Sequence, residues 1–335
     1  MGHVVSRRFI LAAGGALVAA SAQAQTARPK VKIGLLRSLY DVGIGLADSR
    51  SYFAAEGIDV ELYPFSDTAE GSQALAVGAI DAVTQGISGG LLNLMARGVE
   101  AKIVASAGEH APGHGVIGLV IRRELVDSGR FKGPADLKGL KLALGQNAPP
   151  HWLVKKYGDA AGIGRRDVEL VSTGIGNVLP AMINKAIDGA CLLEPYASEL
   201  IRRTDAVRVV SMDQVQPNFP AGYLMFGPSL VTRNHDAGER LLRGYLRGVK
   251  DYRDAFDRSG DKEAVVRDLR SRQVNVATDM VSVGFPEDMA PSTAHVDAFI
   301  AWQMEVGVLK TKPDISSFIA NDQRAAALQA VGGRI

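Results

Sequence analysis

The sequence is poor in cysteine and has little excess charge of either sign. Cys191 is the single cysteine among 335 residues, which excludes an intramolecular disulfide, a cysteine-based zinc site and an iron–sulfur cluster. The 38 Lys and Arg residues nearly balance the 36 Asp and Glu residues, so the basic excess that nucleic-acid binding needs is missing. With 47% hydrophobic and 22% charged residues, the composition is nevertheless that of a folded globular protein, long enough for one large core or two medium ones.

Residues 1–24 have the three-part order of a secretory signal peptide. Arg7 and Arg8 precede an uncharged, mostly apolar run, Phe9–Ala22, and Ala22-Gln23-Ala24 then offers a small-x-small cleavage site. The run is shorter than the roughly 20 residues that a spanning helix needs, as is every later apolar run. We therefore expect export to the periplasm and cleavage. The match of Ser6–Leu11 to a twin-arginine signal is partial, so the export route stays open, and there is no nearby cysteine for a lipid anchor.

Cleavage changes the charge balance of the protein. The removed segment holds two of the 38 basic residues and no acidic residue, so the mature chain carries 36 groups of each sign and is formally neutral. A neutral protein does not attract an acidic partner over a long range. If it captures an anion, a few local groups must provide the selectivity.

From residue 31 onward, short β-type runs alternate with helical segments. Runs rich in Val, Ile, Leu or Ala predict nine strands: Val31–Leu36, Ile58–Phe65, Ile80–Thr84, Lys102–Ala107, Val116–Arg122, Lys141–Leu144, Val168–Ser172, Gly189–Leu193 and Val207–Met212. Helical apolar spacing between them predicts five helices: Val42–Glu56, Glu70–Val77, Leu91–Arg97, His151–Ala161 and Val178–Ala186. This order is typical of an α/β fold with mostly parallel sheets.

The C-terminal third has a different pattern. Helical spacing covers Asp236–Asp257, Glu263–Arg272 and Thr293–Val306, and no strand signal is strong after Arg233. We expect a helical C-terminal region.

A weak internal repeat suggests two lobes of similar construction. Residues 74–82 read as the end of a helix, Ala-Ile-Asp and a buried strand, and residues 180–190 repeat that order. Chance similarity between two ordinary helix–strand units is the alternative. In open α/β sheets, ligands bind at the carboxyl ends of the strands. Two such lobes facing each other would enclose a cleft there.

One motif points toward catalysis. Gly86-Ile87-Ser88-Gly89-Gly90 matches the G-x-S-x-G turn of serine hydrolases and lies between an expected strand and an expected helix. Such an enzyme also needs a histidine, an acid and an oxyanion-hole loop, and His235 and His295 lie downstream in polar helical surroundings with nothing to orient them. A secreted serine hydrolase using Ser88 is therefore the alternative function, and an anion-binding turn at a helix N-terminus is preferred.

The remaining motifs give no cofactor or metal site. His110 and His114 have a zinc-like spacing, but Pro112 and Gly113 between them preclude a helix. Gly174-Ile175-Gly176 begins a dinucleotide-type turn but lacks its third glycine, because Leu179 stands there. Cys191 lies in the middle of an expected strand and is expected in the core. We expect neither a cofactor nor a metal.

Polar groups gather in the loops that follow the expected strands. Each has an ordinary interpretation as a turn or a cap, but their shared position makes them candidates for holding a small polar ligand. The candidates are Arg37, Ser38, Tyr40, Gln85, Gly86, Ser88, Asn147, His151, Trp152, Thr173, Glu194 and Tyr196, with Phe219 as a looser one.

Four stretches resemble the periplasmic substrate-binding proteins of ABC importers, in the sulfonate/nitrate/taurine and thiamine-precursor (NMT1/THI5-like) group. They are Glu56-Gly57-Ile58-Asp59-Val60-Glu61, the helix–Gly-Ala-Ile-Asp unit at 74–81, Pro134-Ala135-Asp136-Leu137-Lys138-Gly139-Leu140-Lys141, and residues 179–196 ending Leu193-Glu194-Pro195-Tyr196. Together they cover residues 31–200 in order. These stretches specify the fold better than they specify the ligand.

The resemblance implies a two-lobed type II binding-protein fold that closes on its ligand about a hinge. Lobe 1 would comprise residues 31–117 and 223–335, and lobe 2 residues 118–222. It also implies a monomeric solute carrier without catalytic activity, which delivers its ligand to a membrane permease with a cytoplasmic ATPase. A sensor subunit that docks on a membrane receptor is a further possibility. Family members that make a thiamine precursor carry a cysteine-rich motif, and this chain has one cysteine.

The ligand class stays open between an aromatic carboxylate or sulfonate, an aminosulfonate and a heterocycle. Arg37 would pair with an acid if it faced the cleft. Trp152, Tyr40, Tyr196 and Phe219 could sandwich a flat apolar body. Glu194 would instead favour a ligand N–H or ammonium, unless it bonds a neighbour within its own lobe.

Overall fold

The computed structural model describes residues 28–65 and 68–335; the expected signal peptide, 1–24, lies outside this range. The strands are β1 (Lys30–Leu35), β2 (Asp59–Pro64), β3 (Ala82–Gln85), β4 (Lys102–Ser106), β5 (Ile117–Arg122), β6 (Lys141–Ala143), β7 (Glu169–Val171), β8 (Gly189–Leu193), β9 (Ala206–Ser211) and β10 (Tyr223–Phe226). The helices are α1 (Val42–Ser49), α2 (Tyr52–Ala55), α3 (Thr68–Ala76), α4 (Gly89–Ala96), α5 (Arg123–Asp127), α6 (Pro149–Asp159), α7 (Ile175–Ile183), α8 (Tyr196–Arg203), α9 (Met212–Val215), α10 (His235–Phe256), α11 (Lys262–Ser271), α12 (Val296–Glu305) and α13 (Asn321–Ala330).

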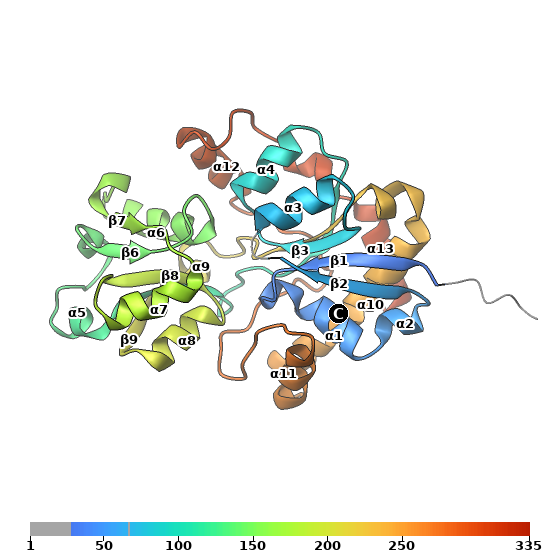
Figure 1. Cartoon of the computed structure of the whole chain (residues 1–335), viewed down its shortest axis with the longest axis horizontal. Helices are drawn as coiled ribbons and strands as arrows, with labels where there is room; N and C mark the ends of the chain where they lie inside the picture. Colours follow the sequence, from blue (N-terminus) through green and yellow to red (C-terminus); the bar gives the residue numbers. More distant parts are fainter. Residues whose placement is uncertain (1–27, 66–67) are drawn as a thin grey trace, which may run out of the picture.

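The strands form two five-stranded sheets with the same topology. The orders are β2-β1-β3-β10-β4 and β7-β6-β8-β5-β9. The sheets lie in separate halves of the molecule, each flanked by helices (Figure 1). The chain crosses from the first sheet to the second between β4 and β5, and it returns between β9 and β10. The expected two-lobed α/β architecture is confirmed.

Both sheets are mixed, with four strands running in one direction and one strand running against them. β1 pairs in parallel with β2 and β3, and β6 pairs in parallel with β7 and β8. The fourth strand of each sheet is antiparallel to both of its neighbours: β10 to β3 and β4, and β5 to β8 and β9. These are the strands by which the chain enters each sheet after a crossing, so they run in the opposite direction to the βαβ units.

The internal repeat has an architectural basis, because its two copies lead into the equivalent strands β3 and β8. The aspartate of each Ala-Ile-Asp stretch bonds the backbone of the strand beside it. Asp81 Oδ2 accepts from the Lys32 N–H at 2.8 Å, and Asp188 Oδ2 accepts from the Lys141 N–H at 2.9 Å. The repeated aspartate therefore joins the start of β3 to β1 in the first sheet and the start of β8 to β6 in the second sheet.

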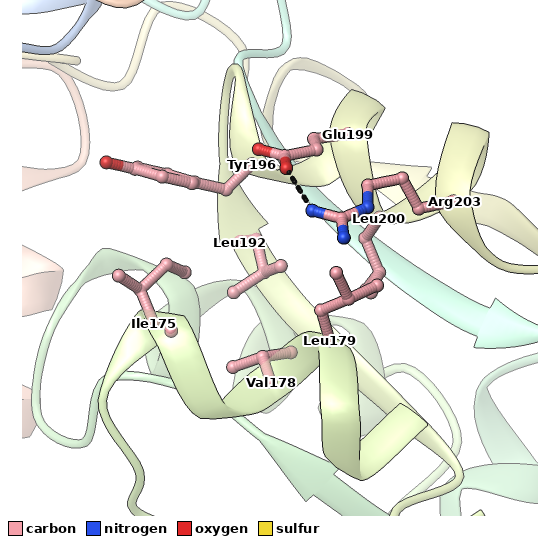
Figure 2. Close-up of a pocket in the computed structure, with 9 residues that line it drawn as sticks. Ile175, Val178, Leu179, Leu192, Tyr196, Glu199, Leu200 and Arg203 are labelled. Atoms are coloured by element: carbon pink, nitrogen blue, oxygen red, sulfur yellow. Dashed lines mark hydrogen bonds and ion pairs between the residues drawn. The ribbon is translucent and has the colours of Figure 1, made fainter. Parts of the chain in front are cut away.

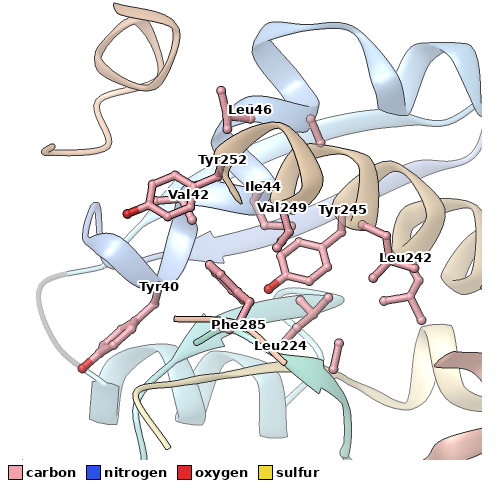
Figure 3. Close-up of a cluster of buried hydrophobic side chains, with 14 of the residues drawn as sticks. Tyr40, Val42, Ile44, Leu46, Leu224, Leu242, Tyr245, Val249, Tyr252 and Phe285 are labelled. Carbon is pink, nitrogen blue, oxygen red and sulfur yellow. The ribbon is translucent and has the colours of Figure 1, made fainter. Parts of the chain in front are cut away.

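A core of buried side chains between α1, α10 and the first sheet holds the loop that follows β1 (Figure 3). Tyr245 on α10 is fully buried, and its hydroxyl donates to the Ser106 carbonyl at 2.6 Å. α1 and α10 approach closely at two glycines, since a Cβ on Gly248 would lie 2.2 Å from the Gly43 carbonyl oxygen. The helix expected over Val42–Glu56 is interrupted at Ser51, whose φ of 59° is left-handed.

The nine expected strands and eight expected helices are all present, with shifted ends. β10 is the strand that the sequence did not indicate. Its four residues are all buried between β3 and β4, so they show no alternation of apolar and polar residues. The helices α5, α8, α9 and α13 were also missed. Within the described residues, no helix is long and apolar enough to cross a membrane.

Candidate binding cleft

A cavity of about 380 Å³ lies where loops from the two sheets meet. Its walls come from the segments after β1, β3, β6 and β7 and from the end of β8. These strands are parallel within their sheets, so their carboxyl ends open toward the same place. The lining residues are Leu36, Ser38, Tyr40, Thr68, Gly86, Ile87, Ser88, Ile117, Leu144, Gly145, Ala148, Pro149, Pro150, Thr173, Ile175, Val178, Cys191, Leu192, Leu193 and Tyr196.

The loop after β1 is fixed by a buried carboxylate. Asp41 is fully buried, accepts from the Ser38 N–H at 2.9 Å and accepts from the Thr84 hydroxyl. Burial raises the pKa of Asp41 to about 7, although these hydrogen bonds act in the opposite direction. Burial, together with the nearby charge of Asp41, also raises the pKa of Tyr40. The Tyr40 hydroxyl therefore keeps its proton and can donate it to a ligand.

The Tyr40 ring packs closely against two glycines, Gly86 and Gly222, on the first sheet's side of the cleft. A Cβ on Gly86 would lie 3.3 Å from the Tyr40 hydroxyl, and a Cβ on Gly222 would lie 3.0 Å from the Tyr40 ring. The small residues let the ring pack between the two backbone segments. The absence of a side chain at Gly86 thus leaves space for the Tyr40 ring.

Ser88 caps the helix that begins at the cleft. Its side-chain oxygen accepts from the Leu91 N–H at 3.2 Å at the start of α4. Ser38 has an equivalent role, because its oxygen accepts from the Tyr40 N–H at 3.3 Å. An oxygen that accepts from the backbone keeps its own O–H for another acceptor.

The second lobe contributes two further helix starts to the cavity. α6 begins at Pro149 after Ala148, and α7 begins at Ile175 after Gly174. Proline suits the first turn of α6 because the missing N–H has no intrahelical partner there. The N-termini of α4, α6 and α7 therefore lie at the cavity wall. Each N-terminus carries partial positive charge, and α4 and α7 also offer free N–H groups, whereas the two prolines that begin α6 have none.

The cavity combines hydroxyl groups with apolar walls. Six hydroxyl-bearing side chains line it: Ser38, Tyr40, Thr68, Ser88, Thr173 and Tyr196. In the part of the chain that the structure describes, no Asp, Glu, Lys, Arg or His lines this cavity. An anion bound here would be held by hydroxyl donors and helix N-termini. A buried carboxylate from the protein would not oppose it.

Six of the thirteen residues predicted from the sequence line the cavity: Ser38, Tyr40, Gly86, Ser88, Thr173 and Tyr196. Arg37 does not; it is exposed, and its carbonyl accepts from the Asn275 N–H at 3.2 Å. Gln85 is fully buried behind the cavity, where its side-chain oxygen accepts from the Ser72 hydroxyl at 3.0 Å. Neither side chain is among those that line the cavity.

Trp152, His151 and Phe219 belong to an aromatic seam between α6 and α12. The Trp152 ring lies 5.3 Å from Trp302 and 5.7 Å from Phe299, and Phe219 packs 5.8 Å from Phe299. His151 packs edge-on against Trp302 at 4.9 Å. We name these five residues the aromatic seam. The rings pack edge-on or tilted against one another, so Trp152 and Phe219 take part in internal packing. Tyr40 and Tyr196, the other two aromatic residues suggested for a sandwich, line the cavity.

Asn147 and His151 connect this seam to the loop after β6. The His151 Nδ1 accepts from the Asn147 N–H at 3.1 Å, and the Asn147 carbonyl accepts from Gln303 Nε2 at 3.0 Å. Burial, with smaller contributions from Arg165 and Lys155, lowers the pKa of His151 to about 4. A neutral His151 therefore positions the first turn of α6, whose residues Pro149 and Pro150 line the cavity.

Glu194 bonds within its own lobe, which was one of the two alternatives that the sequence left open. The side chain is fully buried. It pairs with Arg208 and accepts from the Ser198 hydroxyl at 2.9 Å and the Ser198 N–H at 3.1 Å. The carboxylate is therefore satisfied without a ligand.

Sequence reasoning missed the apolar part of the wall. Ile87, Ile117, Leu144, Val178 and Cys191 line the cavity, yet in the sequence they are indistinguishable from core residues. Cys191 is fully buried, and burial raises its pKa. Only their position in the sequence could have identified them, because these residues lie in or beside the strand ends that carry the polar candidates.

The geometry does not favour the hydrolase alternative. Ser88 accepts a capping hydrogen bond, and among the described residues no histidine lines the cavity to serve as its base. His110 is fully buried beside Phe219, and His114 Nδ1 lies 3.1 Å from the Ser282 hydroxyl. No cluster of three or more His, Cys, Asp or Glu suited to a metal occurs among the described residues.

Solved structures with the same fold include both binding proteins and an enzyme. The periplasmic aliphatic sulphonate binding protein SsuA of Escherichia coli is 16% identical, with a TM-score of 0.69 over 87% of this chain and 97% of that one. The periplasmic nitrate-binding protein NrtA of Synechocystis PCC 6803 is 16% identical, with a TM-score of 0.71 over 91% and 89%. The desulfurization enzyme DSZB is 14% identical, with a TM-score of 0.65 over 90% and 99%. At such identities these matches establish the fold.

Sequence comparison adds the family. A protein of Brucella abortus (strain 2308) that is named a binding protein is 26% identical over 255 residues, or 75% of each chain. Residues 24–264 match the NMT1-like family, which confirms the resemblance inferred from the four sequence stretches. The match covers more than half of the chain, and the protein belongs to the NMT1-like family.

Proposed function

We propose that this protein is the periplasmic solute-binding component of an ABC importer, which captures a small organic anion in the cleft between its lobes. One observation carries the proposal: a cavity of about 380 Å³ with apolar walls, six hydroxyl groups and three helix N-termini, and no charged side chain among the described residues. The anionic head, a sulfonate or a carboxylate, would accept from the hydroxyls and the free N–H groups. Its apolar body would contact the walls.

The two crossings of the chain supply the closing movement in this proposal. Residues 31–117 with 223–335 would form one lobe and residues 118–222 the other, moving about the two connecting segments. The aromatic seam and the Asn147–Gln303 hydrogen bond contact both sides of this division. Periplasmic location, cleavage after Ala24, delivery to a permease and a monomeric state are parts of the same proposal. The family and the periplasmic binding proteins among the structural matches support the periplasmic location.

Binding without catalysis is the function that the site supports best. The hydroxyls and N–H groups of the cleft are donors, and the described cavity offers no general base beside Ser88. The same fold carries an enzyme in DSZB, so the fold alone does not decide this point. Incubation of the protein with each bound ligand, followed by mass spectrometry, should recover the ligand unchanged.

Isothermal titration calorimetry tests the binding proposal directly. We expect saturable binding of linear alkanesulfonates or alkanecarboxylates and much weaker binding of the corresponding alcohols. Thr173→Val and Tyr196→Phe each remove one hydroxyl donor with little change in shape. A hydrogen bond to a charged group contributes about 1.5–3 kcal/mol, so each variant should lose at least tenfold in affinity.

Thr232→Val is the matched control, because the Thr232 hydroxyl bonds the Pro228 carbonyl at the surface. It should bind as the native protein does. If neither acid series binds, or if the alcohols bind equally well, the proposed function is wrong. Native mass spectrometry of the purified protein should also show one copy of the chain and reveal any small molecule that copurifies.

A further inference from the structure

A second, smaller cavity lies between α7 and α8 in the second lobe (Figure 2). Its volume is about 150 Å³, and we call it the α7–α8 groove. Most of its wall is apolar. The lining residues are Ile175, Gly176, Val178, Leu179, Leu192, Tyr196, Glu199, Leu200 and Arg203.

The groove adjoins the ligand cleft. Ile175, Val178, Leu192 and Tyr196 line both cavities. Figure 2 shows the Tyr196 ring extending away from α8, with its hydroxyl directed away from Arg203. The ring therefore lies between the groove and the cleft, and the hydroxyl is available to a ligand in the cleft. Ile175 is 45% exposed at this junction. A ligand in the cleft could therefore continue into the groove without crossing a polar barrier.

The outer end of the groove is closed by a satisfied ion pair. Arg203 Nη1 lies 2.9 Å from Glu199 Oε1, one helical turn apart on α8. The two charges neutralise each other, so they do not call for a charged group on the ligand. Between this pair and the cleft the wall consists of Leu179, Leu192, Leu200 and Val178. The groove is therefore suited to binding a hydrocarbon group.

We propose that the α7–α8 groove is a subsite for an apolar tail, so that the ligand is an amphipathic organic acid with its anionic head in the cleft. The inference rests on the proposed function. An apolar cavity of about 150 Å³ is large enough to hold benzene, so the groove has room for a group of that size. The tail is thus a phenyl group or an alkyl chain of comparable volume.

Chain length is the variable that tests this subsite. Calorimetry with linear alkanesulfonates and alkanecarboxylates from one to ten carbons should show affinity rising about fourfold for each methylene that enters the groove. The rise should stop once the groove is full. A phenylalkane acid that places its ring in the groove should bind as tightly as the best linear chain.

Leu179→Trp tests the location, because the larger side chain fills the groove and leaves the cleft lining unchanged. We expect it to lower affinity for the long acids at least tenfold and to leave methanesulfonate and acetate unaffected. Val77→Trp is the control, since Val77 lies 73% exposed at the end of α3. Leu179→Ala is a second variant that does not require a bulkier side chain. It should move the plateau to longer chains.

The results separate the subsite from the proposed function. If the short acids bind but affinity does not depend on chain length, or if Leu179→Trp weakens short and long acids equally, the subsite is wrong and the cleft assignment stands. If no member of either series binds to the native protein, the proposed function itself is wrong.

Discussion

Removal of Arg208 should destabilise the protein without changing ligand affinity. Glu194 is fully buried, whereas the Arg208 side chain is 18% exposed. Arg208→Met deletes the guanidinium but keeps much of the apolar stem that packs beside Gly118. The variant leaves a buried carboxylate without its counter-charge. Removing one partner of a buried pair costs about 3–5 kcal/mol.

The structure places the expected value at the lower end of that range. Ser198 still donates two hydrogen bonds to the Glu194 carboxylate, from its N–H at 3.1 Å and its hydroxyl at 2.9 Å. Water can also reach the partly exposed space left by Arg208. We therefore expect the free energy of unfolding to fall by about 3 kcal/mol. Urea denaturation followed by circular dichroism measures this change.

Arg123→Met is the matched control in the same lobe. Arg123 and Asp205 are paired at 2.6 Å, with side chains 46% and 80% exposed. An exposed pair contributes about 0–1 kcal/mol, so this variant should be nearly neutral. The double variant Glu194→Gln/Arg208→Met should recover part of the loss because it removes the uncompensated charge.

Two results would refute this reasoning. If Arg208→Met destabilises the protein no more than Arg123→Met does, the buried pair is not a stabilising element. If a folded Arg208→Met protein loses affinity for methanesulfonate or acetate, then Glu194 acts on the ligand despite its position outside the cavity lining.

Three further predictions concern the elements that hold the site. Gly248→Ala places a methyl group 2.2 Å from the Gly43 carbonyl oxygen, so it should lower the free energy of unfolding by about 1–3 kcal/mol, whereas Gly176→Ala, with open space around it, should not be destabilising. Because burial raises the pKa of Asp41 to about 7, the folded protein retains a proton that the unfolded chain releases near pH 4. Stability should therefore fall as pH rises from 4 to 7, and Asp41→Asn should flatten the curve in thermal unfolding. Ser88→Ala should lose a cap contributing about 1 kcal/mol, whereas Ser88→Asp should keep the cap and, by adding a carboxylate to the cleft, abolish anion binding in calorimetry.

Helix and strand order could be predicted because each element depends on local spacing. The repeated Ala-Ile-Asp stretch also indicated two lobes correctly, since Asp81 and Asp188 make the same strand-to-strand hydrogen bond in each sheet. The antiparallel strand β10 was missed because its neighbours in the sheet, β3 and β4, lie more than a hundred residues earlier in the chain.

The sequence predicted a site residue correctly only where the end of a strand places that residue at the cleft. Ser38, Tyr40, Ser88, Thr173 and Tyr196 line the cleft because each follows a strand that opens toward it. Trp152 lies in the same kind of segment, but on the face of α6 that packs against Trp302. Which face of a helix meets a distant segment depends on packing between elements far apart in the sequence.

The sequence by itself determined the α/β order, the two-lobed plan and the family. Those properties follow from composition, periodicity and short motifs. The tertiary structure decided which groups face a ligand: it paired Glu194 with Arg208, placed Trp152 in the aromatic seam and left a cleft of hydroxyls and apolar side chains that extends between α7 and α8. The physical reason is that a charge or a ring acts on whatever lies within a few ångströms, and those neighbours come from segments that only the folded chain brings together.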